Sequence, residues 1–197
     1  MVKEFTQKQV EISFRKFSDY AEDLDSSDYN TFDSHLSIFL NHCENDEIMR
    51  TITTPLKNAE VFDKCDKEFL SKGGSMVGSS KITFPEDEYE MDSYIYQLLL
   101  KLKNKERDIT NITVRAYGAN GLSESVYWFN EKVTSKLTRS LKYKLEEIDE
   151  RIEREVKEGE NIPVNLLIVF QDNRINIKNS KIKGDAVIGK DAQIKKN

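Results

Sequence analysis

Apolar residues recur through the first 158 residues with spacings of three and four, the period of a helix buried on one side. These stripes predict helices over 6–24, from about residue 31, over 46–53, from Pro55, and over 85–105. Thr6 and Gln9 are spaced as a capping box at the first of these, and Gly73 with Gly74 ends the fourth. The predicted fold class is therefore mainly α, a helical bundle.

The longest stripe predicts a final helix over about 124–157, with Ser123 as its N-cap and Leu122 and Tyr127 as a hydrophobic staple. Its second half has a narrow apolar seam among charges. This pattern suits a helix that leaves the body to pack on a partner, and it equally suits the solvated end of a bundle helix. The apolar positions are Phe129, Val133, Leu137, Leu141, Leu145, Ile148, Ile152 and Val156.

The segment DITNITVRAYG (108–118) carries signals of two kinds. Its β-branched residues favour a strand, and a strand would turn the region into a small α/β unit. Asp108 as an N-cap, Gly118 as a C-terminal cap and a helical spacing of apolar residues favour a helix. We predict a helix and keep the strand as the alternative.

The net charge of −5 over 197 residues conceals a split. Residues 174–197 carry a net +5, so the remaining 173 residues carry −10. An acidic body argues against nucleic acid as its partner. No apolar run has the length of a membrane span, no leader follows Met1, and two cysteines suit a reducing compartment, so we expect a cytoplasmic protein without a membrane partner.

The basic tail is periodic. Ile182, Ile188 and Ile194 recur every six residues, and Ala186 and Ala192 follow the first two by four. This pattern resembles the hexapeptide repeat of left-handed β-helices, which implies that each aliphatic residue points into a coil and each small residue allows a corner. The repeat covers about one coil, and residue 176 is Asn where an aliphatic residue belongs.

One coil cannot bury a core alone, so the tail either stacks with the tails of other copies or packs on its own body as a hairpin or edge strand. The preceding run PVNLLIVF (163–170) has the length of a strand. We predict a helical body over 1–158 and an oligomerising β-strand and repeat tail over 162–197. Its interface residues would be Leu166, Ile168, Phe170, Ile182, Ile188 and Ile194.

Catalytic patterns are sparse. His35 and His42 are the only histidines, and no HExxH, CxxC or GxSxG pattern accompanies them, so we predict structural roles and no metal site or cofactor. The loop GGSMVGSSK (73–81) lacks the lysine position of a phosphate loop, because Ser79 follows Gly78. A phosphate or nucleotide sensor built on this loop is a minor alternative.

Ala116, Tyr117 and Gly118, followed by Trp128–Glu131 and the repeat tail, resemble small bacterial phage-defence proteins of the abortive-infection type. The resemblance implies a bacterial, cytoplasmic and oligomeric role, and it transfers no functional residue. The leading hypothesis is a non-enzymatic oligomeric interaction module that serves as a defence or sensing component. Its partners would be other copies of the chain, with a trimer as one option for the number of copies. A second protein is a further option as a partner. The alternative is a metal-dependent nuclease or other small hydrolase that uses acidic residues with His35 or His42.

Overall fold

The computed structural model describes the backbone of all residues except 1–3, 6, 73–83, 159–165, 172–173 and 180–197. The side chains of Glu4 and Gln7, those within the ranges 68–72 and 115–117, and all those beyond residue 150 are also outside the description. The loop 73–80 and the predicted interface residues Ile182, Ile188 and Ile194 therefore lie outside the described residues.

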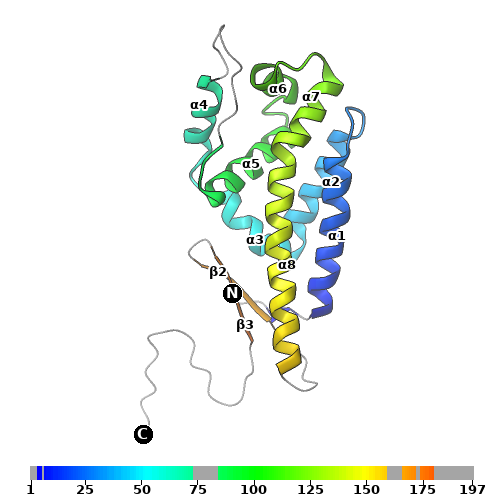
Figure 1. Ribbon diagram of the computed structural model, residues 1–197, viewed down its shortest axis with the longest axis vertical. Helices are drawn as coiled ribbons and strands as arrows, with labels where there is room; N and C mark the ends of the chain where they lie inside the picture. Colours follow the sequence, from blue (N-terminus) through cyan, green and yellow to red (C-terminus); the bar gives the residue numbers. More distant parts are fainter. Residues whose placement is uncertain (1–3, 6, 73–83, 159–165, 172–173, 180–197) are drawn as a thin grey trace.

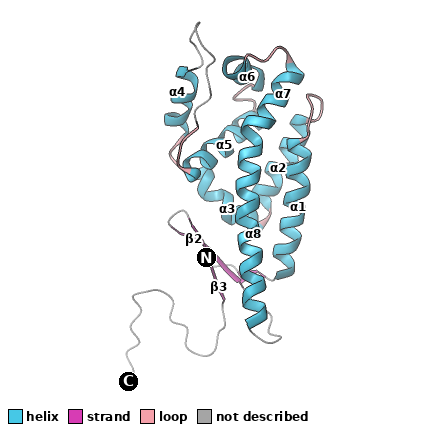
Figure 2. Cartoon of the chain, viewed as in Figure 1, coloured by secondary structure: helices cyan, strands magenta, loops and turns pink. Residues whose placement is uncertain are grey.

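The described chain is mainly helical, as predicted, with a small sheet at one end (Figure 1, Figure 2). The helices in order are α1 (Gln7–Asp25), α2 (Phe32–Asn45), α3 (Glu47–Asn58), α4 (Phe62–Lys72), α5 (Glu88–Lys103), α6 (Ile109–Tyr117), α7 (Leu122–Phe129), a π-helical turn η1 (Asn130–Thr134) and α8 (Ser135–Glu158). The strands are β1 (Glu4–Phe5), β2 (Leu166–Gln171) and β3 (Arg174–Asn179).

The α7–η1–α8 segment runs along the length of the bundle, and α1 lies antiparallel beside α8 (Figure 1). Its apolar residues Phe129, Val133 and Leu137 are spaced by four, and each is fully buried. In a regular α-helix a spacing of four turns the stripe by about 40° each step. The π turn holds an extra residue, which returns the stripe toward the core.

The same stripe continues through Leu141 and Leu145 to Ile148, and all three are fully buried. The helix therefore packs within its own bundle at least this far, as an ordinary bundle helix does. The predicted seam residues Ile152 and Val156 lie where side chains are not described.

The segment 108–118 is a helix, which confirms that prediction and excludes the small α/β unit. The Asp108 carboxylate accepts a hydrogen bond from the Asn111 amide at 2.9 Å. Gly118 ends the helix in the left-handed region, with φ of 67°, and its amide donates to the Val114 carbonyl. Both caps are therefore local, and they outweigh the β-branched composition.

Three predicted boundaries are wrong. Pro55 lies inside α3 and does not start a new helix, because Ile52 and Leu56 on either side of it are buried on one stripe and hold the helix together. The helix predicted from Pro85 starts at Glu88, with the Asp87 carboxylate as N-cap.

Ser123 is not the N-cap of the final helix. That position belongs to Gly121, which has a φ of 104°, and the Glu124 carboxylate accepts from the Asn120 amide at 2.7 Å. Leu122 and Tyr127 are 45% and 59% exposed, so they do not form the predicted staple.

The sheet has the strand order β1-β2-β3, and both pairs are antiparallel. β1 comes from the N-terminus and pairs Phe5 with Leu166, while β2 and β3 form a hairpin that pairs Ile168 with Ile177. β2 lies against α3, and β3 lies against α8. The two ends of the described chain thus meet in one sheet.

We predict that Gly118→Ala lowers the free energy of unfolding by about 1 kcal/mol, because an alanine in the left-handed region is strained. Chemical denaturation followed by circular dichroism measures this change. Gly118→Asn is the matched control and should cost less, since asparagine tolerates that conformation. Equal losses for the two variants would contradict the assignment of the cap.

Candidate functional site

The predicted interface residues of the C-terminal segment divide into two groups. Leu166, Ile168 and Phe170 occupy alternate positions of β2, so the backbone register places these positions on one face of the sheet. Position 166 is paired with Phe5, whose side chain is buried in the bundle core. The residues of the hexapeptide repeat lie outside the described part of the chain.

The two histidines do not meet. The His35 Nδ1 lies 2.8 Å from the carbonyl oxygen of Asp23, and the His42 Nε2 lies 3.3 Å from that of Ser13. The His42 ring also packs edge-on against Tyr20, with 5.4 Å between the ring centroids. Burial lowers the pKa of His42, which favours its neutral form. Both rings therefore tie α2 to α1.

No group of three histidine, cysteine or acidic side chains is arranged to hold a metal ion among the residues whose placement is described. Cys43 and Cys65 are both buried as free thiols, and burial raises the pKa of Cys43. Its thiol is therefore held in the protonated, unreactive form.

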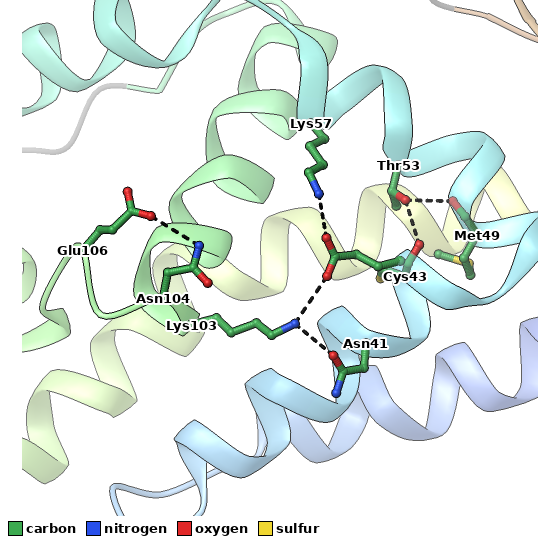
Figure 3. Close-up of polar contacts among 9 residues, drawn as sticks. Asn41, Cys43, Met49, Thr53, Lys57, Lys103, Asn104 and Glu106 are labelled. Atoms are coloured by element: carbon green, nitrogen blue, oxygen red, sulfur yellow. Dashed lines mark hydrogen bonds and ion pairs between the residues drawn. The ribbon is translucent and has the colours of Figure 1, made fainter.

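A charged cluster joins the ends of α2, α3 and α5 (Figure 3). The Glu44 carboxylate accepts from Lys57 at 2.8 Å and from Lys103 at 3.3 Å, and Lys103 also donates to the Asn41 side chain at 2.9 Å. The hydrogen bond from Lys57 is the main cause that lowers the pKa of Glu44. Beside this cluster, the Thr53 hydroxyl of α3 lies within hydrogen-bond distance of the carbonyl oxygens of Cys43 on α2, at 2.9 Å, and of Met49 on its own helix, at 3.0 Å. The cluster fixes how three helices meet.

A second polar cluster lies between α5 and α8. Asp92 is fully buried, and its carboxylate accepts from the Lys144 ammonium and from the Ser140 hydroxyl. Glu88 accepts from the same hydroxyl at 2.9 Å. Burial raises the pKa of Asp92, and the charge of Lys144 opposes that shift. A paired lysine is a poor base for Ser140, so the geometry supports a buried ion pair rather than a serine nucleophile.

Sequence reasoning missed this pair. A signal was present, because Asp92 falls three residues before Ile95 and seven before Leu99, on the apolar stripe of α5. An acid on a buried stripe demands a partner. The sequence did not show which basic residue would supply it, since Lys144 lies 52 residues away.

A third polar site lies where α1 ends against α8. The Thr138 hydroxyl donates to Asp25 Oδ2 at 2.7 Å, while the buried Oδ1 of Asp25 has no partner in the described structure. Burial raises the pKa of Asp25 to about 6, and the Thr138 hydrogen bond and the charge of Arg139 act in the opposite direction. Asp25 also ends α1, where the helix dipole disfavours a negative charge.

Lys144→Met should destabilise the protein by about 3 kcal/mol at neutral pH, because it leaves the Asp92 carboxylate buried without a counter-charge. Adding Asp92→Asn to that variant should recover much of the loss. Urea denaturation gives both values, with Lys67→Met at an exposed position of α4 as the control. A loss of similar size in the control would show that the buried pair has no special role.

Asp25→Asn should stabilise the protein at pH 7 by on the order of 1 kcal/mol, after allowance for partial solvent screening. The raised pKa means that protonated Asp25 favours folding fully below its ordinary value of 3.8, and that this contribution is lost as the pH rises through about 6. The variant should therefore have a flatter stability profile between pH 4 and 6. Asp19→Asn, at an exposed position of α1, is the control, and an unchanged profile in Asp25→Asn would refute the assignment.

Comparison with known proteins adds no assignment to these residues. No protein-family model, no curated protein and no solved structure matches the chain. Within the described residues, no helix combines the length and the apolar character needed to cross a membrane.

Proposed function

We propose that this chain is a non-enzymatic assembly module whose copies associate through the C-terminal β segment. The observation that carries the proposal is the place of β3. This strand is last in the order β1-β2-β3, and the hexapeptide repeat begins within it, at Asn176, and continues beyond its end. A strand at the end of a sheet has backbone groups directed away from its one neighbour, which another chain can pair.

The polar clusters of the bundle support a structural rather than a chemical role. Asp92 with Lys144, Glu44 with Lys57 and Lys103, and both histidines make contacts between helices. These contacts help to hold the bundle together. In the proposed assembly the bundle is a scaffold that presents the sheet.

Within the proposed assembly, Ile182, Ile188 and Ile194 are the buried rungs, and the hairpin of β2 and β3 supports them. One coil of repeat buries too little apolar surface to stand alone, so each tail needs the tails of other copies. The excess positive charge of the tail complements the acidic body of a neighbouring copy.

Deletion of 174–197 should lower the oligomeric state of the chain, because it removes the edge strand and the repeat together. Multi-angle light scattering measures the mass before and after the deletion. Substituting Asp at Ile182, Ile188 and Ile194 should have the same effect in the full-length chain, since charged groups cannot be buried as rungs.

The matched control places Asp at Gln193 and Asn197 and Gln at Lys195, which makes the same three-unit charge change in the tail outside the aliphatic and small positions. This variant should keep the mass of the unmodified protein. A mass that is unchanged by both the deletion and the triple isoleucine substitution would refute assembly through the tail.

A further inference from the structure

A groove of about 620 Å³ lies between α1 and α8. Small residues make it hollow, notably Ser18 and Ala21 from α1 and Ser135 from α8, while Phe17 is part of its lining. Tyr143 lines the same groove and is 61% exposed. One surface therefore carries both a hollow and a large projecting side chain.

The two walls of the groove carry opposite charges where α1 ends and α8 begins. Glu22 and Asp25 lie on α1, and Arg139 and Lys142 lie on α8. Glu22, Arg139 and Lys142 are exposed. Further along α8 the wall becomes acidic at Glu146. At the end of the groove formed by the C-terminus of α1, the α1 wall is thus acidic and the α8 wall is basic.

The hydrogen bond between Thr138 and Asp25 shows which residues of α1 and α8 lie at the same level along the helix axes. The two helices are antiparallel, so four residues further along α8 corresponds to three or four residues back along α1 (Figure 1). Lys142 therefore stands level with Ala21 and Glu22. Rotation by 180° about an axis parallel to the helices leaves each residue at the same level along that axis. It places α8 of one copy opposite α1 of the other.

We propose that this groove is a twofold interface that binds a second copy of the chain. The axis places α8 of each copy against α1 of the other, so that Lys142 faces Glu22 of the second copy. Tyr143 of each copy enters the hollow beside Ser18 and Ala21 of the other. A twofold interface must be self-complementary, and this surface is complementary to itself in both charge and shape.

This interface does not rest on the tail proposed above to drive assembly, because the groove is lined only by α1, the residue that follows it and α8. The occupant is a second copy rather than a small molecule, since the groove is open to solvent and its acidic and basic sides match those of a second copy. The exposed charges also add specificity, because an orientation that places α1 against α1 brings Glu22 and Asp25 of the two copies together.

The test uses full-length Lys142→Glu and Glu22→Lys, each measured alone and then as an equimolar mixture by light scattering over a range of concentrations. Each variant alone places like charges at both copies of the contact, so its mass should fall to half that of the unmodified protein. In the mixed pair every contact again joins a glutamate and a lysine, so mixing should restore the full mass. Lys67→Glu on α4 makes the same charge change outside the groove and should leave the mass unchanged.

Restoration on mixing separates the interface from effects within one chain, because both proteins keep their altered residue. The proposal is overturned if Lys142→Glu matches the Lys67→Glu control, if mixing fails to restore the mass, or if the unmodified protein is a monomer. The tail deletion, measured in parallel, reports on the other interface. A halved mass in Lys142→Glu with no effect of the deletion would support the groove and refute the tail.

Discussion

Burial of one apolar stripe, from Phe129 to Ile148, is the contact on which the rest of the structure depends. Its side chains pack against α1 and α5, and every other helix joins the bundle directly or through those two. The stripe stays buried over five turns because the π turn η1 absorbs the drift of its four-residue spacing. A fully buried apolar side chain contributes roughly 1.5–3 kcal/mol, so this seam outweighs any single polar contact.

The polar groups along this seam determine how far each helix is shifted along its axis relative to its neighbours. Asn130 donates to the Ser27 carbonyl at 3.1 Å, Thr138 donates to Asp25, and Lys144 pairs with Asp92. Apolar contacts alone allow helices to slide, whereas each of these buried groups is costly to leave unpaired. The same contact between Thr138 and Asp25 aligns the walls of the groove. The same buried polar contact therefore aligns the helices in the core and the charged residues on their exposed sides.

Much of the helical fold could be predicted from the sequence, because caps and stripes act over a few residues. The helix at 108–118 is the clearest case, since Asp108 and Gly118 decide it locally. The boundaries at Pro55 and Ser123 could not be predicted in this way. Packing around Leu56 carries α3 through a proline, and α7 begins after Gly121 rather than after Ser123, with the Glu124 carboxylate accepting from the Asn120 amide that precedes the helix. The predicted structural role of the histidines agrees with their contacts to α1.

The sequence by itself determined the helical class, most helix positions and the separate character of the basic tail, because periodicity, capping and charge are local properties. Only the tertiary structure decided which distant groups meet. Lys144 finds Asp92 across 52 residues, and β1 joins the hairpin from the opposite end of the chain. The groove between α1 and α8 also forms only when these two antiparallel helices pack side by side in one particular alignment. Such pairings depend on the relative placement of whole helices, which no short stretch of sequence encodes.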